Sequence, residues 1–253
     1  MRHLVAFFAI LMGSVQVAWA GAWPITPGEA QVIVKYEDQF AQQLVLAQDQ
    51  VLEVQKTEDT RLSLFAEAGF TPTISLQFQG GLARGSDATG DHDGFAPTSI
   101  GVRMLMASSR HFVLSTYVGA TLPGIQLSNR FDPSLGDGNV ELRALAGWSG
   151  HMLGKESFAE LAVARLVEFG DRDQTRVDFT FGRAISRRWQ ALLQVYAGRT
   201  DGGRPLGSRW MKLDQTLVYR LGRWSVQSGW RQTLWGQNIP MAQGPVIAIW
   251  RKF

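Results

Sequence analysis

The sequence contains no cysteine among its 253 residues, and it has only four histidines. A chain without cysteine cannot form disulfides or use a thiol in chemistry, so backbone hydrogen bonds and burial must stabilise its fold. Charged residues are nearly balanced, with 25 Lys and Arg against 22 Asp and Glu, and the pI is about 9.4. Because the basic residues are scattered rather than clustered, this small excess predicts no nucleic-acid partner.

Long apolar runs are missing beyond the first 20 residues, so no later segment resembles a transmembrane helix. The amino terminus itself combines Arg2, an apolar run over residues 4–12, and the small residues Ala18 and Ala20 before Gly21. This pattern predicts a secretory signal peptide over residues 1–20 that is cleaved before Gly21. The alternative, an uncleaved anchor, is disfavoured because the apolar run is too short for a hydrocarbon core of about 30 Å. Cleavage removes one charge, Arg2, and lowers the formal net charge from +3 to +2.

What the chain has instead is alternation of apolar and polar residues with a period of two. From Arg61 onward it divides into segments of about ten residues, which is typical of strands that cross an outer membrane. An amino-terminal strand near residues 31–38 brings the expected number to about twelve, and single-chain bacterial barrels have an even number. The sequence therefore predicts an all-β fold, a transmembrane antiparallel β-barrel, as one domain over residues 21–253. Residues 40–53 remain open between strand, loop and a short helix or plug.

The connections between these segments alternate in length, as expected for outer-membrane barrels with short periplasmic turns and long external loops. One long connection, residues 149–157, is expected on the short side. The expected short turns lie at Thr71, Ser108, Ser186 and Leu221. The expected long loops cover residues 85–97, 123–138, 170–174, 200–209 and 236–244.

Aromatic residues are expected at the two membrane interfaces, where amphipathic rings are favoured. A soluble β-sandwich, the alternative, would bury them. The periplasmic girdle is predicted to contain Phe112, Trp148, Trp189, Trp224 and Phe253, and the outer girdle Phe169, Trp210 and Trp235.

The carboxy-terminus shares a face with Ile247 and Ile249, and the terminal Phe253 resembles the signal by which the barrel assembly machinery recognises outer-membrane proteins. Arg251 interrupts the apolar pattern of that signal. The segments "GAWPITPGEAQVIV", "GDGNVELRALAGW" and "LGRWSVQSGW" further resemble a broad group of proteobacterial outer-membrane barrels. Among named groups the chain looks most like the outer-membrane proteins associated with meta-pathway phenol degradation. The resemblance implies a small transport-type barrel without catalytic residues.

The inward-facing positions carry the candidate functional residues. Five acidic and five basic side chains balance one another, so strong charge selectivity does not follow. Such charges either pair across strands or line a wet path, and a twelve-stranded barrel is expected to leave a narrow or partly plugged pore. The lumen-lining candidates are Glu67, Arg103, Glu141, Arg143, Glu160, Asp178, Lys212, Asp214, Arg220 and Arg231.

Catalysis finds little support in the sequence. A serine hydrolase needs a histidine beside its nucleophile, and the sequence around Ser149 lacks the last glycine of a nucleophile elbow. After the signal peptide, the histidines are His92 in an expected external loop and His111 and His151 at expected periplasmic turns. Acidic loop residues at positions 87, 91, 93, 171 and 173 could offer oxygen ligands but lack the EF-hand spacing. We therefore expect no enzyme, cofactor or metal site.

These observations predict a protein of the bacterial outer membrane in contact with the lipid bilayer and lipopolysaccharide. The favoured function is a narrow channel or transporter for small solutes, which the resemblance extends to aromatic or apolar compounds. A structural or surface-interaction barrel with a filled lumen is the alternative, and a lipid-modifying hydrolase is a third. The solute, the oligomeric state and any gating are not set by the sequence.

Overall fold

The computed structural model of the chain describes residues 21–46, 50–87, 90–127, 138–170, 173–201 and 207–253. Within these residues, twelve long strands and two strands of two residues each form one antiparallel sheet. No helix in this part of the chain is long and apolar enough to cross a membrane. The long strands are β1 (Ala30–Val45), β2 (Val51–Thr71), β3 (Ile74–Asp87), β4 (Gly90–Ser108), β5 (Phe112–Leu122), β7 (Asn139–Met152), β8 (Lys155–Glu168), β9 (Gln174–Ala184), β10 (Trp189–Thr200), β11 (Arg209–Leu221), β12 (Trp224–Gln237) and β14 (Gln243–Lys252), and the short ones are β6 (Ile125–Gln126) and β13 (Ile239–Pro240).

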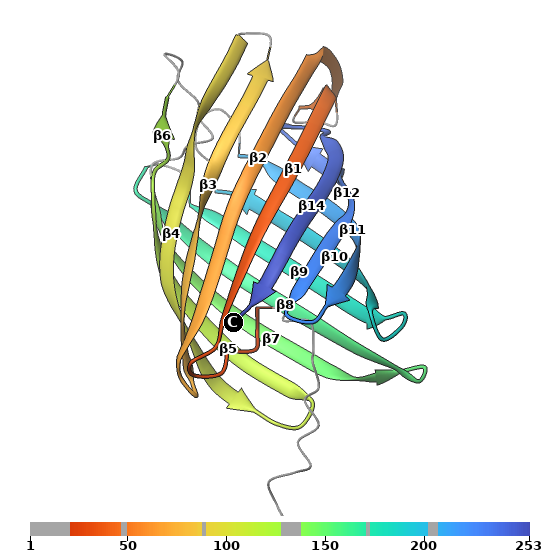
Figure 1. Cartoon of the computed structure of the whole chain (residues 1–253). Helices are drawn as coiled ribbons and strands as arrows, with labels where there is room; N and C mark the ends of the chain where they lie inside the picture. Colours follow the sequence, from red (N-terminus) through yellow and green to blue (C-terminus); the bar gives the residue numbers. More distant parts are fainter. Residues whose placement is uncertain (1–20, 47–49, 88–89, 128–137, 171–172, 202–206) are drawn as a thin grey trace, which may run out of the picture.

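The sheet closes into a barrel because the first strand pairs on both sides (Figure 1). Each long strand lies beside its neighbour in sequence, and Ile33 of β1 is opposite both Phe65 of β2 and Trp250 of β14. Closure leaves no unpaired edge, so the backbone groups of the wall bond to one another and the wall can stand in a membrane. The predicted all-β, antiparallel barrel of about twelve strands is confirmed.

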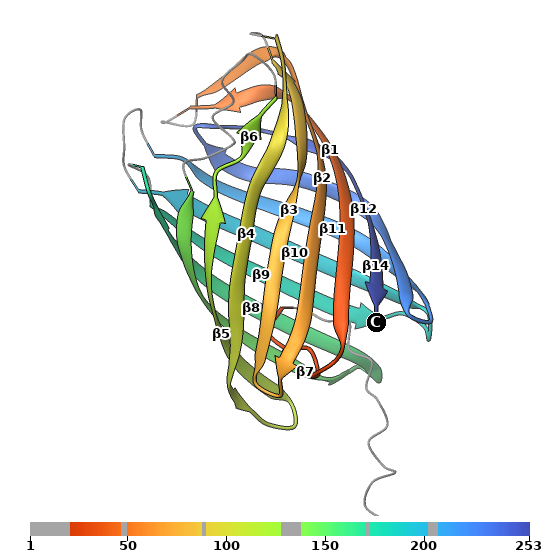
Figure 2. The ribbon, with the colours of Figure 1, turned by 60° about the vertical axis from the view of Figure 1, so that its left-hand side comes forward.

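One end of the barrel has tight turns and also holds the described start and the end of the chain (Figure 2). Its five connections contain two to four residues each. The predicted long connection at residues 149–157 is wrong, because β7 and β8 continue to a two-residue turn, Leu153-Gly154. Both turn residues have positive φ, 50° and 73°, as a type I′ hairpin turn requires. These five short turns lie on one side, as a periplasmic end would have them.

At the opposite end the hairpins are longer than predicted. Residues 40–53, left open between strand, loop and helix, form the end of β1 and the start of β2 where they are described. The expected loop over residues 85–97 is mostly strand, because β3 and β4 remain paired from Gln79 to Gly90. The alternation of apolar and polar residues does not predict such extensions. Both faces of a hairpin that projects beyond a bilayer meet water, so neither face needs to be apolar. Parts of the other expected loops, such as residues 128–137, lie outside the described residues.

The outer face of the wall is apolar and exposed, whereas the inner face is largely buried. Leu161, Val163 and Val167 of β8, for example, are exposed on the outside. The inner face of β8 is also mostly apolar, with Phe158, Ala162, Ala164 and Leu166 buried beside the single carboxylate Glu160. This double apolar pattern explains why the alternation of β8 is weak in the sequence.

Aromatic side chains mark the end with the short turns. Phe112, Trp189, Trp224 and Phe253 are all exposed on the wall there. Arg251 fits among them because its guanidinium carbon lies 4.8 Å from the Trp224 ring centre and 4.6 Å from that of Phe253, a cation–π arrangement that keeps the charge at the rim.

The outer girdle prediction is wrong for Trp210. Its ring lies over Gly198, whose missing side chain makes the space for it. Gly198 shares the inner face of β10 with Gln194 and Tyr196, which border the lumen cavity. Position 210 has the same strand parity as Lys212 and Asp214, so alternation directs Trp210 inward. Phe169 and Trp235 are exposed, as predicted.

Candidate functional site

The ten predicted lumen residues all lie on barrel strands with buried or half-buried side chains. Glu67, Arg103, Glu141, Glu160 and Asp214 are buried, and the other five are half-buried. Those that border the central cavity are Glu67, Arg143, Glu160, Asp178 and Asp214. The structure thus places half of the ten residues around one cavity. That they bind or guide a solute stays a prediction.

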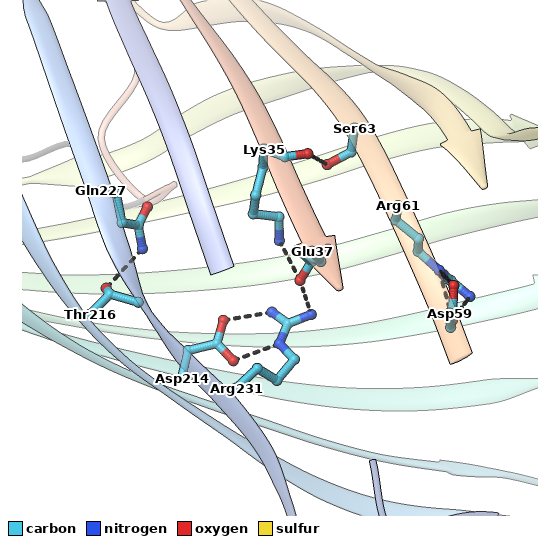
Figure 3. A network of polar contacts seen from close by, with 9 residues as sticks. All are labelled: Lys35, Glu37, Asp59, Arg61, Ser63, Asp214, Thr216, Gln227 and Arg231. Carbon is cyan, nitrogen blue, oxygen red and sulfur yellow. Dashed lines mark hydrogen bonds and ion pairs between the residues drawn. The ribbon is translucent and has the colours of Figure 1, made fainter. Parts of the chain in front are cut away.

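Four charged side chains form a network where the barrel closes (Figure 3). Arg231 of β12 donates to both carboxylate oxygens of Asp214 on β11, each at 2.6 Å. The same guanidinium pairs with Glu37 of β1, which also pairs with Lys35 at 3.2 Å. β14 lies between β1 and β12, and its residue opposite Arg231 is Gly244, which has no side chain to block the contact. The network is neutral and connects three strands across the closing ladder.

A second ionic cluster lies on β2, β3 and β4. Arg103, only 1% exposed, pairs with Glu67, and Ser75 donates to the same carboxylate. On β7, Arg143 donates to Glu141 at 2.6 Å. Most lumen charges are therefore paired with one another, which favours a rigid interior over a strongly charged pore.

Two of the predicted lumen charges differ from the rest. Asp178 of β9 and Lys212 of β11 make no hydrogen bond and no close ion pair with any described residue. Both are opposite Tyr196 of β10, one on each side, so the three form a row across neighbouring strands. The guanidinium of Arg231 lies 5.0 Å from the Tyr196 ring centre. One acidic and one basic group thus remain available around an aromatic ring.

The chain before β1 lies inside the barrel, a feature that the sequence did not predict. Ala22 and Ile25 are buried, and the Ala22 carbonyl accepts a hydrogen bond of 2.6 Å from Ser115 Oγ. The Trp23 ring packs edge-on against Phe158 at 6.3 Å between ring centres. It also occupies the space that a side chain at Gly147 would fill. We call residues 21–27 the inner segment.

The inner segment is attached to the wall at its far end. Gly69 of β2 donates its N–H to the Glu29 carbonyl at 3.0 Å, and Pro27 bridges to Gly69 in parallel. A side chain at Gly69 would collide with the Thr26 carbonyl, so glycine is needed for this close approach. The segment enters at the end with the short turns (Figure 2). Residues 21–27 thus lie inside the lumen, whereas the described part of residues 40–53 belongs to the strands of the wall.

A cavity of about 310 Å³ lies beside the inner segment in the lumen. Amide side chains of Gln31, Gln77, Gln79, Gln194 and Gln227 share the lining with aromatic rings. The aromatic residues at its border are Trp23, Phe65, Tyr117, Phe158, Tyr196 and Trp250. Trp250 Nε1 and Gln31 Oε1 are buried without a hydrogen-bond partner among the described residues. The cavity offers apolar rings with a few polar groups, the usual composition of a small-molecule site.

Among the side chains that the structure describes, the residues considered for chemistry do not come together. His111 Nδ1 lies 2.9 Å from the backbone carbonyl oxygen of Ser149, and a carbonyl oxygen is not a nucleophile. The side chains of His111 and His151 are both exposed. The side chains of His92 and Asp87, and all of Asp171, lie outside the described residues. Among the side chains that are described, no three His, Cys, Asp or Glu residues are grouped as metal ligands would be.

The rim opposite the short turns carries an exposed ionic cluster. Arg165 of β8 pairs with Asp173 at 2.7 Å and with Asp201, just after β10, at 2.6 Å. The Arg165 guanidinium donates to Asp201 and holds the pKa of that carboxyl below its usual range. Asp173, a candidate oxygen ligand in the sequence, thus serves as an ion-pair partner.

Sequence reasoning missed Lys35, Glu37 and Tyr196 as lumen residues. Lys35 and Glu37 share one face of β1 with Gln31, and this alternation could have identified them. The inner segment has no comparable signal, because its apolar residues follow no strand period.

Comparisons with known proteins concern the fold. No protein-family profile and no curated protein matches the sequence. The COG4313 outer membrane channel from Pseudomonas putida F1 has a similar structure, with a TM-score of 0.69 and 15% identity over 94% of this chain and 100% of that one. The β domain of the Bordetella autotransporter BrkA gives a TM-score of 0.54 at 11% identity, over 89% of this chain and 99% of that one. The translocator domain of the autotransporter NalP from Neisseria meningitidis gives 0.53 at 9% identity, over 88% of each chain. The chain therefore has the β-barrel fold of outer-membrane proteins.

Proposed function

We propose that the protein is a narrow outer-membrane channel or transporter for small solutes. The observation that carries the proposal is the lumen cavity of about 310 Å³, bordered by aromatic rings and by the unpaired Asp178. Lys212 lies two strands away in the same row. A mixed lining of this kind supports passage of small solutes with an aromatic or apolar part, as the resemblance to the phenol-degradation group also implies.

Location in the outer membrane is supported by the exposed apolar face of the wall and by the fold of the similar structures. A charge at mid-membrane on this face costs about 2–4 kcal/mol, whereas one near an interface costs much less. We expect Val163→Arg, on the outer face of β8, to impair folding into phospholipid vesicles. Leu153→Arg, in the exposed two-residue turn, serves as the control and should fold normally. Equal folding of both variants would contradict the membrane location.

Planar-bilayer recording tests the channel directly. We expect small discrete current steps, because the inner segment and the paired charges leave a narrow path. Asp178→Asn should shift ion selectivity toward anions and Lys212→Met toward cations, since each removes one unpaired lumen charge. Asp91→Asn, an exposed acid on β4, is the matched control and should leave selectivity unchanged.

The second candidate is a structural or surface-interaction barrel. It is favoured by one observation, the packing of the inner segment against β5, β7 and β8, which fills part of the lumen. Electrical silence of correctly folded protein, together with no uptake of small solutes into vesicles, would support this candidate and overturn the channel.

A further inference from the structure

Glu160 of β8 differs from the other buried carboxylates of the lumen. Glu37, Glu67, Glu141 and Asp214 each pair with an arginine or lysine. Glu160, 9% exposed, has no such partner within ion-pair distance among the described residues. Its hydrogen bonds come from the backbone N–H groups of Ala22 and Gly21, both in the inner segment. A carboxylate at this depth is costly unless a cation or several donors meet it.

The surroundings of Glu160 offer little compensation from the wall. Phe158 and Ala162, its inward neighbours on β8, are buried and apolar, and Trp23 packs on Phe158. Arg103 and Arg143 lie near enough to act on Glu160 electrostatically, but their ion pairs are with Glu67 and Glu141. The site is therefore a carboxylate that is only partly compensated, by backbone N–H groups and by arginines already paired elsewhere.

The group that faces this carboxylate is the beginning of the inner segment. A Cβ atom at Gly21 would lie 3.4 Å from Glu160 Oε1, which is van der Waals contact. The sequence places the predicted cleavage site directly before this residue, after Ala18 and Ala20. Hydrolysis by a signal peptidase consumes one water, breaks the bond between Ala20 and Gly21, and leaves a carboxylate on Ala20 and an amine on Gly21. That amine is protonated below its usual pKa of about 7.7–8.0.

We propose that Glu160 is the binding site for the α-ammonium group of Gly21 in the processed chain. Before cleavage the Gly21 nitrogen is a neutral amide, whereas after cleavage it carries a positive charge at the position where Glu160 has no ion-pair partner. The new ion pair, the hydrogen bond from Ser115 to the Ala22 carbonyl, and the packing of Trp23 on Phe158 then hold the inner segment in the lumen. Cleavage of the signal peptide thereby fixes the inner segment in place.

Protection of the α-amine against acylation tests this site. Protein purified from outer membranes should have the mass of residues 21–253. At neutral pH an amine-reactive ester should label its α-amine at least about tenfold more slowly in the folded barrel than in urea, because pairing and burial both suppress the free amine. The tryptic peptide 21–35 reports this label, since Lys35 is the first basic residue after Gly21.

Glu160→Gln should restore labelling to the rate of the unfolded chain. Glu156→Gln, an exposed acid on the same strand, is the matched control and should remain protected. A mature chain that starts elsewhere, or a Glu160→Gln barrel that stays protected, overturns the proposal. Retained heat-modifiable gel mobility shows that each variant is folded.

A second variant covers the case in which Glu160→Gln does not fold. A chain with one serine added before Gly21 keeps Glu160 but moves the amine by about 3.8 Å. Its amine should be labelled rapidly, and continued protection overturns the proposal. These readouts need no conductance, so failure of the channel function and failure of this site are distinguished.

Discussion

Two walls of the lumen are built in opposite ways. The apolar wall, formed by Val113, Tyr117, Leu145, Phe158 and Ala162 on β5, β7 and β8, is covered by the inner segment. The charged wall, formed by Lys35, Glu37, Asp214 and Arg231 on β1, β11 and β12, is held by ion pairs between strands. The first wall is covered by a segment that is held against it by packing and a few hydrogen bonds, whereas the second is part of the hydrogen-bonded sheet and is held by ion pairs. A change of lumen width is therefore expected on the apolar side.

The largest expected effect is on the charged wall. Arg231→Met leaves Glu37 and Asp214 buried without their shared partner, and breaking a buried pair in this way costs about 3–5 kcal/mol. Urea unfolding of the barrel in micelles measures the loss. Arg199→Met is the control, because Arg199 and Asp201 are 62% and 41% exposed and 3.8 Å apart, and such pairs contribute at most about 1 kcal/mol. Similar losses in the two variants would remove the distinction between the charged wall and the rim.

The second expected effect is on the apolar wall. Trp23→Ala removes the ring that packs on Phe158 and over Gly147, and we expect a loss of about 2 kcal/mol, below the range for a fully buried tryptophan. The looser inner segment should also raise single-channel conductance severalfold. Trp189→Ala, on the exposed outer surface, is the control, and its conductance should equal that of the unaltered protein. Unchanged conductance in Trp23→Ala would show that the inner segment does not obstruct the path.

The smallest expected effect concerns the exposed rim, which belongs to neither wall. The pKa of Asp201 is lowered in the folded chain by Arg165, so its ion pair adds stability above the ordinary titration range of aspartate, near pH 3.9. That contribution is lost as the pH falls through the lower folded pKa. We expect Asp201→Asn to be slightly less stable than the unaltered protein at neutral pH, and the two unfolding curves to converge in acid. A difference that grows as the pH falls would contradict this assignment.

The barrel could be predicted from the sequence because its wall separates lipid from a polar interior, so every strand alternates. That rule also places Arg231 and Asp214 inside, although it does not say that they pair. It fails at β8, where Phe158 and Ala162 face the inner segment rather than water. The inner segment itself rests on contacts with residues far away in the sequence, which no local period reveals.

Closure by β1 and β14 carries a consequence for assembly. Ile33 and Trp250, paired across this ladder, are separated by nearly the whole described chain, so this ladder joins the two ends of the sheet. Until it forms, the open sheet has two unpaired edges that can pair with other chains, and joining such distant segments is slow. The ion pair between Glu37 and Arg231, which connects β1 to β12 across β14, can form only after the two ends of the sheet have paired.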